Sequence, residues 1–124
     1  MEGRTIPLHG GGELVIGGGP LIEGLIHGWV RKPTPAPDGN FMISVKQARE
    51  LAEMLRTRGV GKVGLFAGTV MACQGADLTI LWFYGWGSRT PEFAARLNGG
   101  AAGRFIDALS DHYESADAEI TRAA

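Results

Sequence analysis

The sequence predicts an α+β domain with a small, mainly antiparallel β-sheet and two or three helices packed on it, on one side. Three features lead to this prediction: two apolar runs joined by a polar turn, a helix with a capping signal, and helix-spaced apolar residues near the C-terminus. The expected order of elements is roughly β-β-β-α-β-β-α-α. At 124 residues, the chain is expected to form a single domain, 1–124.

The two apolar runs, 62–72 and 78–86, are predicted to form an antiparallel pair at the centre of the sheet. The segment between them, 73–77, contains the Gly and Asp that favour a short hairpin loop. Thr79, Leu81 and Phe83 point to one face of the second strand. The other face carries only apolar or aromatic side chains, Leu78, Ile80, Trp82, Tyr84 and Trp86. Either both faces are covered within the monomer or one face meets a partner.

The N-terminal third is predicted to add strands. Segments 4–9 and 13–16 read as two short strands around a glycine turn, although Pro7 restricts the first to an edge strand or none. Segment 21–32 is ambiguous, but its two glycines disfavour a helix and we expect a strand. Three prolines then predict a surface loop over 33–40.

Three segments are predicted to be helical. In 44–59, Ser44 and Gln47 form a capping box and Gly59 suits the C-terminal end. The same segment has an apolar stripe at helical spacing, Ala48, Leu51, Ala52 and Leu55. In segment 90–97, Thr90 is the expected N-cap and Pro91 takes the first helical position. No internal repeat is evident. Segment 102–121 has a seam at coiled-coil spacing that would pack on the sheet or pair between subunits, with Ile106, Leu109, Tyr113, Ala116 and Ile120.

Composition limits the functional classes. A net charge of −1 with 20% charged residues argues against general nucleic-acid binding, and no apolar run is long enough to span a membrane. One cysteine and the lack of a leader-like N-terminus lead us to expect a cytoplasmic protein. No zinc, phosphate-loop or nucleophile motif is present, so we expect no metal and no cofactor. The Cys73 thiol has no evident base partner.

One polar set could carry chemistry. Glu23, His27 and Arg31 share a strand face with Trp29, so a carboxylate, an imidazole and an anion-binding guanidinium lie in line. On a strand, however, Glu23 and His27 lie ~13 Å apart. A bent strand or a helix would bring them together. An ordinary polar outer face of an edge strand explains these residues better than a catalytic site does.

Two functional hypotheses follow. The first is a small non-enzymatic binding, inhibitor or accessory protein of phage or mobile-element type, acting through an oligomeric interface that contains Trp82, Tyr84, Trp86, Ile106, Leu109 and Tyr113. The protein would be a homo-oligomer or bind another protein. The alternative is a small enzyme or sequestering protein for an anionic or nucleotide-like ligand, with Glu23 and His27 as candidate catalytic residues and Trp29, Arg31, Trp86 and Arg89 as ligand-binding residues.

Overall fold

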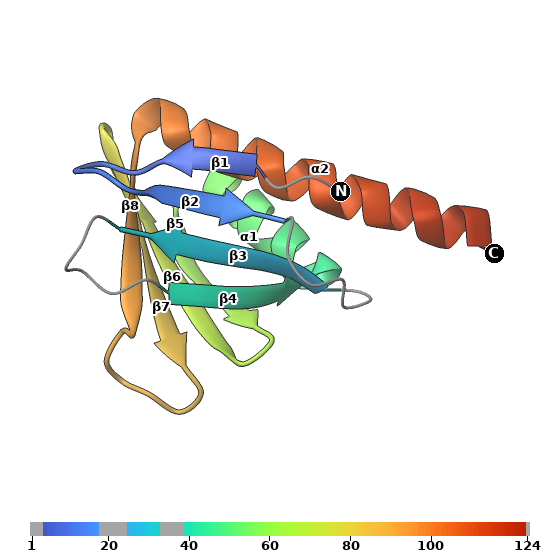
Figure 1. The fold of residues 1–124 in the computed structure, drawn as a ribbon, viewed down its shortest axis with the longest axis horizontal. Helices are drawn as coiled ribbons and strands as arrows, with labels where there is room; N and C mark the ends of the chain where they lie inside the picture. The colour runs from blue at the N-terminus through green and yellow to red at the C-terminus, as the bar shows by residue number, and fades with distance from the viewer. Residues whose placement is uncertain (1–3, 18–24, 33–38, 124) are drawn as a thin grey trace.

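The computed structural model describes residues 4–17, 25–32 and 39–123, with side chains of the last helix described as far as His112. Within these ranges the fold is α+β, as predicted. The elements follow the order β-β-β-β-α-β-β-β-β-α, with the strands in two four-stranded antiparallel sheets (Figure 1). The prediction of a single sheet and of the order β-β-β-α-β-β-α-α was therefore wrong.

Sheet 1 contains β1 (Arg4–Pro7), β2 (Glu13–Ile16), β3 (Leu25–Arg31) and β4 (Gly39–Ser44), in that spatial order. Sheet 2 contains β5 (Val60–Leu65), β6 (Gly68–Gln74), β7 (Leu78–Gly85) and β8 (Phe93–Asn98), also in sequence order. Helix α1 (Val45–Thr57) joins the sheets, and α2 (Gly99–Ala123) ends the chain.

The central hairpin is confirmed as β6 and β7, but the sequence-based strand boundaries differ from it. The predicted strand 62–72 is two strands, because the chain reverses at Phe66 and Ala67. The predicted helix 90–97 is instead the strand β8. Thr90, its expected N-cap, lies in the preceding loop, where its carbonyl accepts a hydrogen bond from the Ser88 hydroxyl.

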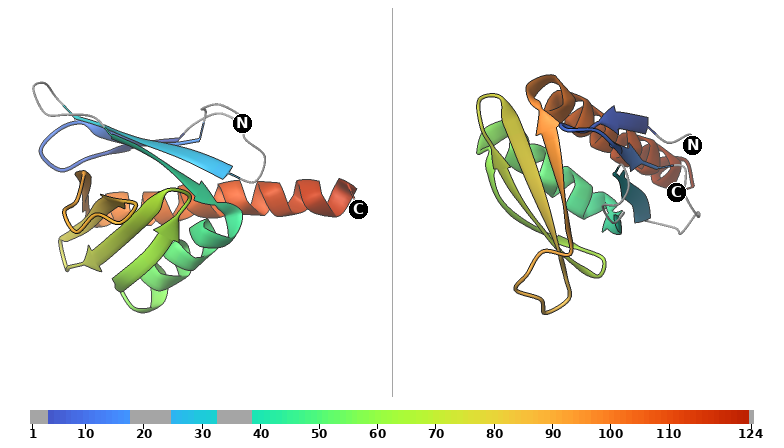
Figure 2. Two further views of the ribbon diagram at one scale, coloured as in Figure 1. Left: turned by 90° about the horizontal axis from the view of Figure 1, so that it is seen from below. Right: turned by 60° about the vertical axis from the view of Figure 1, so that its left-hand side comes forward.

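Both helices pack against each other and against the sheets (Figure 2). Helix α1 begins at the predicted capping box, in which Ser44 Oγ accepts from the Gln47 amide at 3.1 Å and Gln47 Oε1 accepts from the Ser44 amide at 3.0 Å. The buried stripe is also as predicted, with Ala48, Leu51, Ala52 and Leu55. Gly59 follows the helix in the left-handed region, at φ +72°.

The two halves of the chain repeat one arrangement. Each consists of four antiparallel strands followed by a helix, and the inward-facing pairs occupy matching register positions. Ile6 opposite Leu14 in sheet 1 corresponds to Val63 opposite Val70 in sheet 2. Most matching positions differ in residue identity, although Trp29 corresponds to Trp82, and this explains why the repeat is not evident in the sequence.

Two matching hydrogen bonds join the sheets at their edges. The His9 amide, in the β1–β2 turn, donates to the Arg96 carbonyl of β8 at 2.8 Å. The Phe66 amide, in the β5–β6 turn, donates to the Met42 carbonyl of β4 at 3.0 Å. Each sheet is thus tied by its first turn to the last strand of the other sheet.

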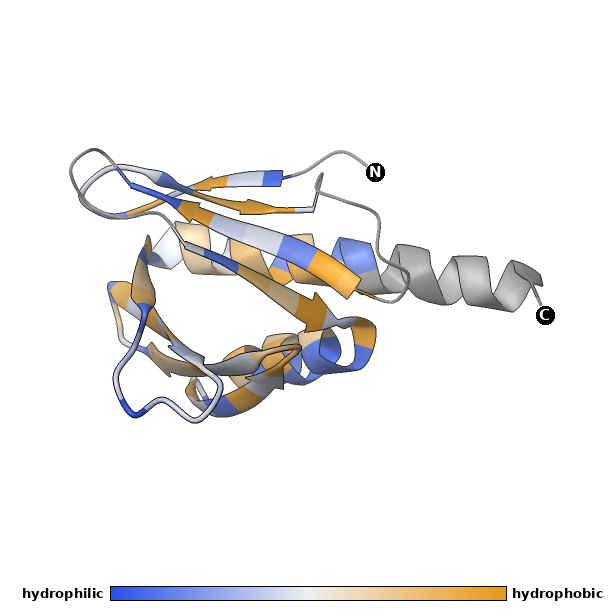
Figure 3. Ribbon diagram, turned by 60° about the horizontal axis from the view of Figure 1, so that its bottom comes forward, coloured by the Kyte–Doolittle hydropathy of each residue, from blue (hydrophilic) through white to orange (hydrophobic). Residues whose placement is uncertain are grey.

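A single buried cluster lies between the sheets and the helices, with contributions from every strand and both helices. Figure 3 shows apolar segments along strands of both sheets, while the loop after β7 is polar. Among the described residues, no helix combines the length and hydropathy needed to cross a membrane.

Candidate binding surface

The outer face of sheet 2 carries a row of apolar side chains that remain partly exposed. Strand β7 alternates between the core and this face, with Thr79, Leu81 and Phe83 buried inside. The side chains of the outer face are only half-buried, namely Leu78, Ile80, Trp82 and Tyr84. The sequence predicted this division of β7, and the structure shows which face the core uses.

Trp82 lies at the centre of this face. In register, Met71 of β6 lies beside it on one side and Ala94 of β8 on the other. Met71 is 37% exposed, and Cys73 is exposed two residues further along β6. Exposed basic residues flank these rows, with Lys62 on β5 and Arg96 on β8. The face therefore has an apolar centre and basic edges, the layout of many protein interfaces.

The matching face of sheet 1 carries the residues proposed for chemistry. His27 and Trp29 lie there side by side, with ring centroids 4.0 Å apart. Both imidazole nitrogens of His27 are shielded from solvent and have no hydrogen-bond partner among the described residues. Because neither nitrogen is accessible, His27 is poorly placed to exchange protons with a substrate in this conformation.

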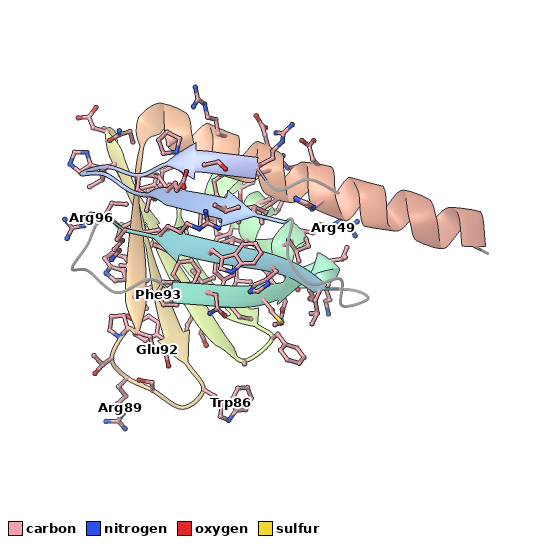
Figure 4. All side chains as sticks on the ribbon, in the orientation of Figure 1. Arg49, Trp86, Arg89, Glu92, Phe93 and Arg96 are labelled. Atoms are coloured by element: carbon pink, nitrogen blue, oxygen red, sulfur yellow. The ribbon has the colours of Figure 1, made fainter. Side chains whose placement is uncertain are left out.

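The remaining members of that set do not complete a site. Arg31 lies 3.8 Å from the Glu13 carboxylate in an exposed pair, which is a weak interaction. Glu23 lies outside the described residues. Trp86 and Arg89 belong to the loop between β7 and β8, and in Figure 4 both project from its far end. Trp86 lies between Gly85 and Gly87 and is 85% exposed.

The predicted interface residues of the last helix, as far as they are described, pack within the chain. Leu109 is fully buried in the core, so it cannot contribute to an exposed interface. Ile106 is partly buried and packs against that core. The side chain of Tyr113 lies outside the described part of α2. The described half of this helix therefore uses its apolar stripe within the chain, because α1 and both sheets pack against it.

The histidine, cysteine and acidic side chains of the described residues form no metal centre, and His112 is a core residue. No group of three or more metal-binding side chains occurs among the described residues. His112 is buried against Gly17 and lies 3.3 Å from the Ile16 carbonyl. Burial lowers the pKa of His112 below its usual range, because charging a desolvated imidazole is unfavourable. This histidine is a neutral core residue at pH 7.

One basic cluster was not identified from the sequence. A cavity of about 340 Å³ between the β1–β2 turn and β8 is lined by His9, Lys32 and Arg96. His9 Nδ1 lies 2.9 Å from the Asn98 side-chain oxygen, which orients the ring. His9 and Lys32 are brought close by the pairing of β2 with β3 in sheet 1, and only the association of the two sheets adds Arg96. No short sequence motif marks such a site.

No family model matches this chain, and neither does any curated protein or solved structure.

Proposed function

We propose that this chain is a non-enzymatic binding protein that self-associates through the outer face of sheet 2. The observation that carries the proposal is the row of Met71, Trp82 and Ala94, an apolar centre that remains partly exposed. Burying the rest of the half-buried Trp82 and of the partly exposed Met71 removes apolar area from water. Each side chain would contribute part of the ~1.5–3 kcal/mol that full burial of one large apolar side chain gives. Trp is also enriched among interface hot spots.

Sheet 2 is a better candidate than sheet 1 for three reasons. Its outer face has large exposed apolar side chains, Met71 in its centre at 37% and Val60 on the edge strand β5 at 58%. The corresponding position to Met71 on sheet 1 is the smaller, half-buried Val15. Sheet 1 also carries the Glu13 and Arg31 charges on that face, which would have to be desolvated in an interface.

The size of the face indicates how it would be used. Four strands ~4.8 Å apart and about seven residues long cover roughly 400–500 Å². A standard interface buries about 800 Å² on each partner. A stable dimer therefore needs adjoining surface as well, and the exposed Trp86 at the end of β7 would supply part of it.

Charge distinguishes a second copy from an acidic partner. Two copies stacked face to face would bring the basic edges, Lys62 and Arg96, near like charges. Salt screens such repulsion, so self-association should strengthen with ionic strength, whereas binding to an acidic partner would weaken.

The proposal also includes a cellular location and a biological role. An exposed free Cys73 suits a reducing compartment, and we place the protein in the cytoplasm. Small size and a function based on surface occupation would suit an inhibitor or accessory protein of phage or mobile-element type.

Sedimentation velocity of matched tryptophan variants tests the proposal. Trp82→Ala should weaken self-association by about 30-fold or more, the usual effect of removing an interface hot spot. Trp29→Ala changes the equivalent position on sheet 1 and should leave it unchanged. Circular dichroism checks that both variants fold. A wild-type chain that stays monomeric at high concentration, or equal effects of the two substitutions, would contradict the proposal.

A second candidate function is the binding of a small anion at the cavity lined by His9, Lys32 and Arg96. Three basic side chains around one cavity favour a phosphate or carboxylate. Arg96→Gln should reduce phosphate binding measured by NMR titration, with Arg31→Gln as the control. Equal phosphate affinity in Arg96→Gln and the wild type would exclude this site.

A further inference from the structure

An apolar cavity lies where β4 of sheet 1 meets the β5–β6 turn and the adjoining ends of β5, β7 and β8 of sheet 2. It has a volume of about 230 Å³ and is lined mainly by apolar side chains. We call it the aromatic slot, because its walls include Phe41, Phe66, Phe83, Tyr84 and Phe93. It is the structural counterpart of the basic cavity, since each lies between the first turn of one sheet and the last strand of the other.

The aromatic walls are held in place by packing. Phe41, Phe83 and Phe93 form a column in which successive ring centroids are 4.6 Å apart. Phe41 and Phe83 are buried in the core, while Phe93 is partly exposed. Phe66, which also lines the slot, is 63% exposed, and its amide donates to the Met42 carbonyl. The slot therefore combines a packed aromatic column with one exposed ring.

The carboxylate-bearing residue Glu92 lines the aromatic slot. The amide of Glu92 donates to the Phe83 carbonyl at 2.8 Å, which fixes the backbone at the start of β8. The Glu92 carboxylate lies directly against the Gly85 backbone, in the space that a Cβ atom at that position would occupy. Glu92 has no ion pair or side-chain hydrogen bond with any described residue, and the described lining contains no Lys, Arg or His. Figure 4 shows Glu92 and Phe93 together at this end of β8.

We propose that the aromatic slot binds an organic cation between the exposed Phe66 ring and the Glu92 carboxylate. The faces of the stacked column are already covered, because Gly28 lies against Phe41 at one end and Gly39 lies against Phe93 at the other. An aromatic face attracts a cation through the partial negative potential of its π-system, and the effect grows as water is excluded. A carboxylate without a partner adds a second attraction that a neutral ligand cannot use. The slot is smaller than the 300–1,000 Å³ typical of sites for drug-sized ligands. It therefore suits one cationic group, a quaternary ammonium or a guanidinium.

NMR titration with pairs of equal shape and different charge tests this proposal. Choline is compared with its neutral isostere 3,3-dimethylbutan-1-ol, and N-acetylarginine amide with N-acetylcitrulline amide, all at constant ionic strength. Amide shifts of Phe66 and Phe93 report occupancy. Each cation that fits should bind at least about fivefold more tightly than its neutral counterpart. Preference for choline would indicate a free ammonium ligand, and preference for the arginine amide would indicate a side chain of another protein.

The variant Glu92→Gln keeps the shape of the side chain and removes its charge. It should abolish the preference for cations while leaving the amide spectrum dispersed, and Glu53→Gln on the exposed face of α1 should change nothing. Equal binding of cations and neutral isosteres by the wild type would overturn the proposal. So would the absence of shifts at the slot, or an unchanged cation preference in Glu92→Gln.

Discussion

Because the two sheets repeat one arrangement, a pair of residues packed in one sheet should tolerate the sizes found at the equivalent pair in the other sheet. Gly28 of β3 lies opposite Phe41 of β4, and the Phe41 ring covers Gly28 so closely that a Cβ atom there would overlap it. The equivalent pair in sheet 2 has the sizes reversed, with Leu81 opposite Ala95. Both pairs are buried, so each fills one layer of the core with a large residue from a different strand.

The single substitutions should each be costly. Phe41→Ala removes a fully packed ring and should cost about 3–5 kcal/mol of the free energy of unfolding. Gly28→Leu forces a large side chain against Phe41 and should cost about 1–3 kcal/mol. If the effects were independent, the double variant would lose about 4–8 kcal/mol, enough to unfold many domains of this size.

The double variant Gly28→Leu with Phe41→Ala should instead lose only about 1–2 kcal/mol, because the new leucine fills the space left by the ring. Part of that loss is the stacking of Phe41 on Phe83. Urea unfolding followed by circular dichroism measures all three variants. A double variant that is less stable than Phe41→Ala alone would refute the equivalence of the two layers.

Three further predictions concern stability. Burial lowers the pKa of His112, and the hydrogen bond to the Ile16 carbonyl and then the Asp111 charge oppose this shift. The unfolded chain therefore binds more protons below about pH 6.5, so the free energy of unfolding should fall as pH decreases through that range. His112→Gln should flatten this dependence in urea unfolding at several pH values. Ser44→Ala removes the capping bond of α1 and should lower the free energy of unfolding by ~1 kcal/mol, so a loss below the error of denaturation would show that the cap is unimportant. Gly59→Ala should destabilise the fold by roughly 1–2 kcal/mol, because the φ of +72° at this position disfavours a side chain. Gly103→Ala, at an open position within α2, should instead raise the melting temperature. The same sign of change at both positions would contradict this reasoning.

Local signals predicted individual elements well. The Ser44 capping box and the stripe after it were sufficient to define α1, because both depend on residues within one helix. The alternation along β7 separated the buried Leu81 from the half-buried Trp82 without knowledge of the fold. The outer face of sheet 2 was identified by the same alternation.

Longer-range features were missed for identifiable reasons. Strand β4 runs directly into α1 with Ser44 as both its last residue and the helix cap, so no turn signal separates them. Strand β8 was obscured by Pro91, which resembles a helix start. The reversal at Phe66 and Ala67 lacks the usual turn residues in its two-residue loop. With β4 and β8 unrecognised, neither the second sheet nor the repeat could be predicted.

The failure to recognise β4 and β8 also explains why the two cavities were not predicted. The basic cavity uses Arg96 of β8, and the aromatic slot uses Phe41 of β4 and Phe93 of β8. Both sites form only where an edge of one sheet meets a turn of the other. His27 and Arg31 share a strand in sequence, but this local pattern did not indicate that the His27 nitrogens would be shielded.

The alkylation rate of Cys73 tests the central proposal most directly, because this thiol lies on the outer face of sheet 2 beside Ile80 and is exposed in the monomer. If the face is buried between copies, the rate of iodoacetamide labelling should fall as protein concentration rises through the range of self-association, and Trp82→Ala should restore the fast rate. A labelling rate that stays fast while sedimentation shows an oligomer would place the interface elsewhere on the protein.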